Sequence, residues 1–143
     1  MTDLDIAKNE LYEENLTLAI VKNGEVLYKT KSNRISGFLD AIENLCAKLE
    51  GASLADRVAG KAIALLCVYA RIKEVYAAVL SRKAQAILKQ YEITYHWKEL
   101  VDNVLDATKT GVCPFEKAAA NTSNPQEAYK TFRTLRENLR TCK

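Results

Sequence analysis

Residues 75–97 read VYAAVLSRKAQAILKQYEITYHW, a pattern of strand, helix and strand. Residues 75–80 form a short apolar run typical of a buried strand. Ser81 is a good N-cap for a helix that reaches about Tyr91. Residues 93–97 then form a second strand. Because strands joined through a helix run parallel with a right-handed crossover, the sequence predicts an α/β protein.

The sheet begins with a hairpin. Residues 16–21 are aliphatic and β-branched, Asn23 and Gly24 follow, and residues 26–29 form a second short run. Asn-Gly between two such runs is the strongest short-range hairpin signal. We therefore expect a mixed sheet in a three-layer α/β/α sandwich that starts with an antiparallel pair.

Capping residues predict the first two helices. Thr2 and Asp5 have capping-box spacing at the start of a short N-terminal helix. Ser36 is a candidate N-cap for a helix over residues 37–49, and Gly51 stands at its C′ position.

Capping residues also predict two later helices. After a short extended segment at 52–55, Asp56 is a candidate N-cap for a long apolar helix that reaches about residue 70. Asn124 and Pro125 fit the cap and first position of the last helix.

Length and charge bound the class of protein. The 143 residues fit one domain, which we assign to 1–143 with an N-terminal helical extension at 1–14 and a C-terminal helix at 124–143. The net charge of +3 is too small to indicate a nucleic-acid partner.

No targeting segment is evident, and the longest apolar run, 62–70, is far shorter than the roughly 20 residues of a membrane helix. We expect a cytoplasmic protein.

Cysteine and histidine usage argues against a metal site. None of the four cysteines forms a C-x-x-C pair, and the chain has one histidine, His96. No spacing matches that of a zinc site, so we expect neither metal nor cofactor.

Three neighbouring residues are candidates for a ligand site. Asp56 stands where a strand is expected to feed a helix, which is where open α/β sheets bind ligands. Gly60 inside the expected helix indicates a close approach by a backbone or ligand. Lys61 would carry its charge toward the helix start, where an anion could balance it. A plain helix cap and a solvated lysine are the competing interpretations.

The sequence CPFE at residues 113–116 is the sharpest local signal. Pro114 fits the first position of a helix, which makes Cys113 the N-cap, where free amides and the helix dipole favour a thiolate. Glu116 could complete a capping box or act as a general acid or base. An inert thiol at a capped helix is the alternative.

Two basic segments are weaker candidates. Ser81 opens its helix with a hydroxyl and two following cations, a combination that suits phosphate. The last helix carries cations at near-helical spacing, which could face an acidic partner. A Ser cap with solvated charges and a solvated helix face are the more common explanations of these two segments.

From Leu16 to about Leu135 the chain resembles a small prokaryotic family of unknown function with a cytidine-deaminase-like fold. The motifs that carry the resemblance are the LAIVKNG hairpin at 18–24, ADRVAGKA at 55–62, and CPFE at 113–116. Zinc deaminases place H-x-E and P-C-x-x-C at two helix starts. The helix starts expected here read Ala55-Asp56-Arg57 and Ser81-Arg82-Lys83-Ala84, without a thiol or imidazole.

The resemblance thus implies a deaminase-like fold that keeps its pocket with a different lining. The candidate catalytic residues are Cys113, Glu116 and Asp56. The candidate ligand-binding residues are Lys61, Gly60, Arg57 and Ser81. Because deaminase-fold proteins are commonly oligomeric, the resemblance also implies a homo-oligomer.

The leading functional hypothesis is a metal-free pocket for a nucleotide-like or other anionic small molecule, with Cys113 as a nucleophile. The competing hypothesis is a non-catalytic binding or assembly module. The sequence does not decide whether the protein is an enzyme. Nucleic-acid binding is the least favoured class, and no membrane partner is expected.

Overall fold

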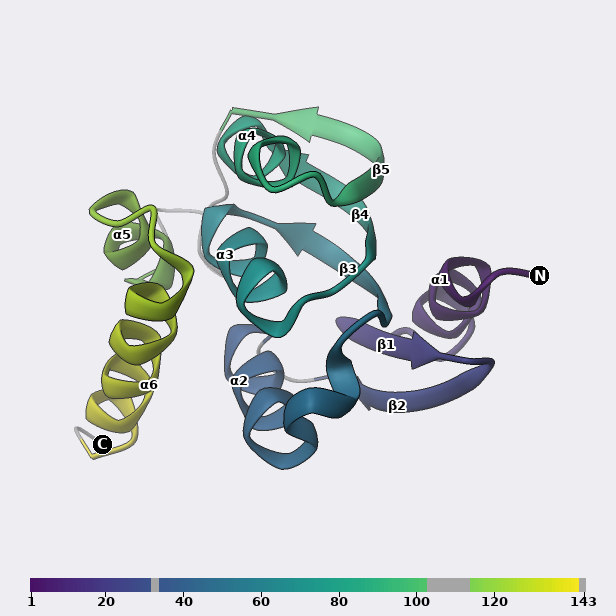
Figure 1. Ribbon diagram of the computed structural model, residues 1–143, viewed down its shortest axis with the longest axis horizontal. Helices are drawn as coiled ribbons and strands as arrows, with labels where there is room; N and C mark the ends of the chain where they lie inside the picture. The colour runs from purple at the N-terminus through teal and green to yellow at the C-terminus, as the bar shows by residue number, and fades with distance from the viewer. Residues whose placement is uncertain (32–33, 103–113, 142–143) are drawn as a thin grey trace.

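The computed structural model describes residues 1–31, 34–102 and 114–141. In these residues a five-stranded mixed sheet has the order β2-β1-β3-β4-β5 (Figure 1). Strand β1 is antiparallel to both β2 and β3, whereas β3, β4 and β5 are parallel. The strands are β1 (Leu18–Lys22), β2 (Glu25–Thr30), β3 (Ser53–Ala59), β4 (Glu74–Ser81) and β5 (Thr94–Val101). The expected α/β fold with an antiparallel hairpin and a parallel β-α-β unit is confirmed.

Helices cover both faces of this sheet. Helix α1 (Asp3–Glu13) packs on one face, against β1, β3 and β4. The other face carries α2 (Arg34–Leu45), the 3₁₀ helix η1 (Cys46–Leu49), α3 (Lys61–Ala70) and α4 (Arg82–Gln90). An outer pair, α5 (Pro114–Ala120) and α6 (Pro125–Thr141), packs on α3. Figure 1 shows this pair beyond α2 and α3, outside the three expected layers.

Helix α3 lies at the centre of the molecule. Six consecutive side chains, from Ala62 to Cys67, are buried, because the sheet lies on one side and α6 on the other. Burial of a leucine such as Leu65 or Leu66 contributes roughly 1.5–3 kcal/mol. The helix is apolar nearly all round for this reason.

The hairpin turn has the expected geometry. Asn23 and Gly24 have φ values of 53° and 77°, both in the left-handed region. The Asp3 carboxylate accepts hydrogen bonds of 2.9 Å from both of their backbone amides. Helix α1 is therefore tied to the turn through its first residue.

Three predicted caps are confirmed. Thr2 and Asp5 form a reciprocal capping box at α1. The Ser81 hydroxyl accepts from the Ala84 amide at 3.0 Å. At α6, Asn124 Oδ1 accepts from the Glu127 amide at 3.0 Å.

Two predicted caps are wrong. Asp56 lies inside β3, which continues to Ala59, so the apolar helix begins four residues later than predicted, at Lys61, with Gly60 as N-cap. A strand buried on both faces needs no polar alternation, and Asp56 is accommodated partly because its carboxylate accepts from the Val58 amide at 3.1 Å. Ser36 lies inside α2, which begins at Arg34.

The end of α2 also differs from the prediction. The helix stops at Leu45, and η1 continues the chain to Leu49. Cys46 at this junction has a φ of 49°. Gly51 has a φ of 80°, the left-handed conformation expected at its predicted C′ position, although the helix that it follows is η1. No helix in the described part of the chain is both long and apolar enough to cross a membrane.

Candidate functional site

The start of α3 holds a carboxylate from α5. Gly60, the N-cap, has no side chain to accept from the first amides of the helix. Glu116 supplies the missing acceptors, because its two oxygens accept from the amides of Lys61 at 3.2 Å and Ala62 at 2.8 Å. A helix start favours such an anion through its free amides and its dipole.

Gly60 is required by this contact. A Cβ atom at this position would lie 2.4 Å from Oε1, 2.5 Å from Cδ and 2.8 Å from Oε2 of Glu116. Real Cβ contacts do not come this close. A close approach at Gly60 therefore exists, but the approaching group is the Glu116 side chain rather than the expected backbone or ligand.

Opposing effects act on the proton affinity of Glu116. Burial raises the pKa of its carboxyl group above the ordinary value. The hydrogen bonds from Ala62 and Lys61 and the ammonium groups of Lys83 and Lys61 act in the opposite direction but do not cancel it. Glu116 thus keeps a proton to a higher pH than an exposed glutamate does.

The start of α4 lies next to the start of α3. Strands β3 and β4 are parallel and in register, with Ala59 beside Leu80, so the helices that follow them begin at the same edge of the sheet. The Ser81 hydroxyl there is engaged as the cap of α4, and Arg82 pairs with Asp102 at 2.9 Å. Lys83 is the α4 side chain whose charge reaches Glu116.

Asp56 and Arg57 do not lie at this edge. Asp56 is fully buried in the middle of β3, opposite Leu18 of β1 and Ala77 of β4. Arg57 donates from Nε to Leu16 O at 2.9 Å and from Nη2 to Leu11 O at 3.1 Å. Its guanidinium is therefore engaged with the carbonyl groups at the end of α1, away from Glu116.

The predicted nucleophile, Cys113, lies outside the described residues. Helix α5 begins at Pro114, as expected for proline at the first helical position. The convergence of Cys113 with Glu116 and Lys61 therefore stays a prediction.

The described residues hold no metal-binding group. Among residues 1–31, 34–102 and 114–141, no three His, Cys, Asp or Glu side chains form a group that could hold a metal ion. The helix start compared with H-x-E was placed too early, at 55–57. The corrected start, Gly60-Lys61-Ala62, also lacks a thiol and an imidazole.

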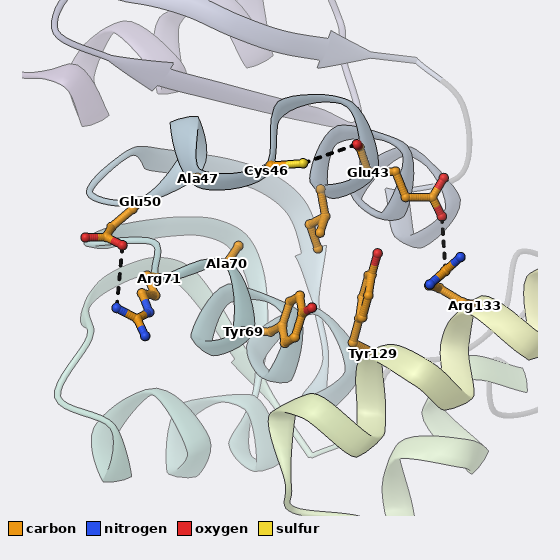
Figure 2. A pocket seen from close by; sticks show the side chains of 10 residues that line it. Glu43, Cys46, Ala47, Glu50, Tyr69, Ala70, Arg71, Tyr129 and Arg133 are labelled. Carbon is orange, nitrogen blue, oxygen red and sulfur yellow. Dashed lines mark hydrogen bonds and ion pairs between the residues drawn. The ribbon is translucent and has the colours of Figure 1, made fainter.

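A cleft at the opposite end of α3 was missed by the sequence analysis. It has a volume of about 500 Å³ and lies between α2, η1, the last turn of α3 and α6 (Figure 2). We call it the tyrosine cleft, after Tyr69 and Tyr129, whose stacked rings line it. Two tyrosines separated by 60 residues give no local sequence signal, so only the fold reveals their pairing.

The comparisons with known proteins identify the family. The TM1506 family, a domain of unknown function (DUF1893), matches residues 6–135, and the chain belongs to it. The crystal structure of a DUF1893 family protein (TM1506) from Thermotoga maritima at 2.70 Å resolution is similar, with a TM-score of 0.84 and 21% identity over 94% of this chain and 90% of that chain.

A weaker likeness is to Acinetobacter baumannii RibD, form 2. Its TM-score is 0.46 at 20% identity, over 74% of this chain and 30% of that chain. Among curated proteins, none matches the sequence.

Proposed function

We propose that the chain binds an anionic small molecule at the edge of the sheet where α3 and α4 begin, with Glu116 as the acid–base group of the site. Nucleotide-like molecules are the first ligands to test. The observation that carries the proposal is the half-buried Glu116 carboxylate held by the amides of Lys61 and Ala62. The proposal leaves open whether a reaction follows binding.

The charges around Glu116 support an anionic ligand. Lys61 and Lys83 both lower the pKa of the Glu116 carboxyl group electrostatically, so two positive charges act on one carboxylate. An anionic group placed beside them would meet a net positive site. It would also raise the proton affinity of Glu116, since like charges favour the neutral acid.

The properties of Glu116 support acid–base use. A carboxyl group whose pKa is raised by burial is suited to proton transfer closer to neutral pH. Two fixed amides hold it in one orientation, which a proton-transfer group requires. Cys113, three residues earlier, is the proposed nucleophile of this site.

The competing interpretation is a structural one. Glu116 would then only tie α5 to the start of α3, and the chain would act as a binding or assembly module. The two interpretations differ in ligand binding. Only the binding-site interpretation predicts that the chain binds an anion and that Lys61 and Lys83 contribute to its affinity.

The test is an NMR titration with inorganic phosphate and a nucleoside monophosphate, in which the Lys61, Ala62 and Lys83 amides are followed. We expect saturable shifts at these amides, and binding weakened at least about tenfold when Lys61→Ala and Lys83→Ala remove two charges. The control Lys73→Ala with Lys98→Ala removes the same charge elsewhere. An absence of shifts at millimolar ligand, or an equal loss in the control, would refute the site.

The proposed homo-oligomer is a separate question. Light scattering coupled to size exclusion measures the mass directly, and a mass of 16.0 kDa would identify a monomer.

A further inference from the structure

The tyrosine cleft is built where three helices end. Its lining comes from α2 and η1, from the last turn of α3, and from α6. Its volume of about 500 Å³ lies within the range of about 300–1,000 Å³ that small-molecule sites occupy. The cleft is thus large enough for a ligand, and it does not overlap the start of α3.

Its aromatic wall already binds a cation on one side. The rings of Tyr69 and Tyr129 are stacked with centroids 4.2 Å apart and an interplanar angle of 14°. The Arg133 guanidinium lies over the Tyr129 ring, 5.5 Å from its centroid. Aromatic faces attract cations electrostatically, so this wall favours a positively charged ligand.

Each end of the cleft carries a carboxylate. Glu50 pairs with Arg71 at 3.5 Å at one end, and Glu43 pairs with Arg133 at 3.4 Å at the other, as Figure 2 shows. The lining also includes the apolar side chains Ile42, Ala47 and Ala70. The cleft therefore combines two separated acids with an apolar surface.

Both ion pairs are exposed to solvent, and the Glu50 side chain is itself 60% exposed. The side chains of Arg71 and Arg133 are 75% and 53% exposed. Exposed pairs of this kind contribute little to stability, so a ligand cation could replace either arginine at low cost. Glu43 would stay in place, because the buried Arg136 also binds it.

The backbone also favours a cation. Helices α2, η1 and α3 all end at the cleft, and helix C-termini carry partial negative charge. Neither α2 nor α3 has a basic residue in its last turn, whereas Lys48 lies in the last turn of η1 and Arg71 is the C-cap of α3.

We infer that the tyrosine cleft binds a linear aliphatic diamine or polyamine. The methylene chain would pack against Ile42, Ala47 and Ala70, and the ammonium groups would meet Glu43 and Glu50. The Tyr69 ring would contribute a cation–π contact. The competing ligand class is an aliphatic dicarboxylate, whose two carboxylates would have to pair with Arg71 and Arg133.

Calorimetric titration of the full chain with spermidine at low ionic strength tests the inference. We expect saturable binding that Glu50→Gln and Tyr69→Leu each weaken about three- to fivefold. The control Glu25→Gln removes the same charge from the exposed start of β2 and should leave the affinity unchanged. Thermal unfolding verifies that each variant is folded.

Cys46 provides a second readout, because its exposed thiol lines the cleft. Spermidine should slow its alkylation by iodoacetamide, read by peptide mass, and glutarate should not. The inference is overturned if spermidine does not bind, if glutarate binds more tightly, or if Glu25→Gln weakens binding as much as Glu50→Gln.

Discussion

The two ends of α3 carry opposite partial charges of the helix dipole, and their surroundings differ. At the start of the helix, the positive end of the dipole meets a carboxylate of the chain itself, Glu116, and Gly60 leaves no room for even one more carbon atom. At the other end, the negative end of the dipole opens on a cleft of about 500 Å³ lined by Tyr69 and Tyr129.

This difference separates a tightly held group from an open site. Glu116 is fixed by two amides, so its position and proton affinity are set by the fold. The tyrosine cleft is bounded by exposed ion pairs, so its lining can rearrange around a ligand. Variants at the two ends should therefore affect stability and binding to different degrees.

The largest effect on stability is expected beneath the tyrosine cleft. Arg136, whose side chain is 5% exposed, joins α6 to Asp40 at 2.9 Å and to Glu43 of α2. Arg136→Ala should lower the free energy of unfolding by about 2–3 kcal/mol, because it leaves a buried gap and two acids without this partner. Urea denaturation measures the change.

Arg133→Ala is the matched control. It lies one turn earlier in α6 and shares Glu43 as a partner, but it is exposed, so its removal should cost only about 0–1 kcal/mol. Equal costs for the two variants would contradict the distinction between a fixed support and a movable rim.

A smaller effect is expected at the start of α3. Gly60→Ala should push the Glu116 carboxylate off its two amides and cost about 1–2 kcal/mol. In a Glu116→Ala background the same change should cost almost nothing, since the backbone at Gly60 has φ −100° and ψ −173°, which alanine adopts easily. A double-mutant cycle by urea denaturation gives the coupling, and additive costs would disprove the contact.

Glu116 should also make stability depend on pH. Its pKa is raised in the folded protein, so the fold favours the protonated form, and this contribution is lost as pH rises from the ordinary carboxyl range through the higher folded value. The unfolding free energy of the wild type minus that of Glu116→Gln should therefore fall as the pH rises above the ordinary carboxyl pKa of 4.5. A difference that grows over this range would be incompatible with the raised pKa.

The smallest expected effect concerns the reactivity of the cysteine thiols. Burial, together with Asp56, raises the pKa of Cys67 well above the ordinary value, so this thiol should not react in the folded protein. Cys46 is exposed and should react, whereas Cys113 should react first if it caps α5. Alkylation at limiting reagent, read by peptide mass, gives the order, and slower labelling of Cys113 than of Cys46 would remove the nucleophile from the proposed site.

Local signals in the sequence were enough for most of the fold. The Asn23-Gly24 turn, the Ser81 cap and the parallel strands around α4 follow from rules that act over a few residues. Asp56 was misassigned because an acid after an apolar run is typical of a helix start. The strand instead continues, since the fold buries both of its faces and provides acceptors for Arg57 in Leu11 of α1 and in Leu16, which follows that helix.

The site was predicted only in part for the same reason. The sequence motifs indicate Gly60 and Glu116 separately, and the contact between them arises from the packing of α5 on α3. The tyrosine cleft had no signal, because Tyr69, Tyr129 and Glu50 come together only through the tertiary fold. Contacts between distant segments are what local sequence rules cannot supply.

We propose that the Glu116 carboxyl group holds a proton beside a binding site for an anion. Carbon-13 NMR of the Glu116 carboxyl group, titrated with and without inorganic phosphate, measures this directly. We expect a pKa above the ordinary value of 4.5 in the free protein, and a further rise when phosphate binds, because a neighbouring negative charge favours the neutral acid. A pKa at or below 4.5 that phosphate leaves unchanged would contradict the account.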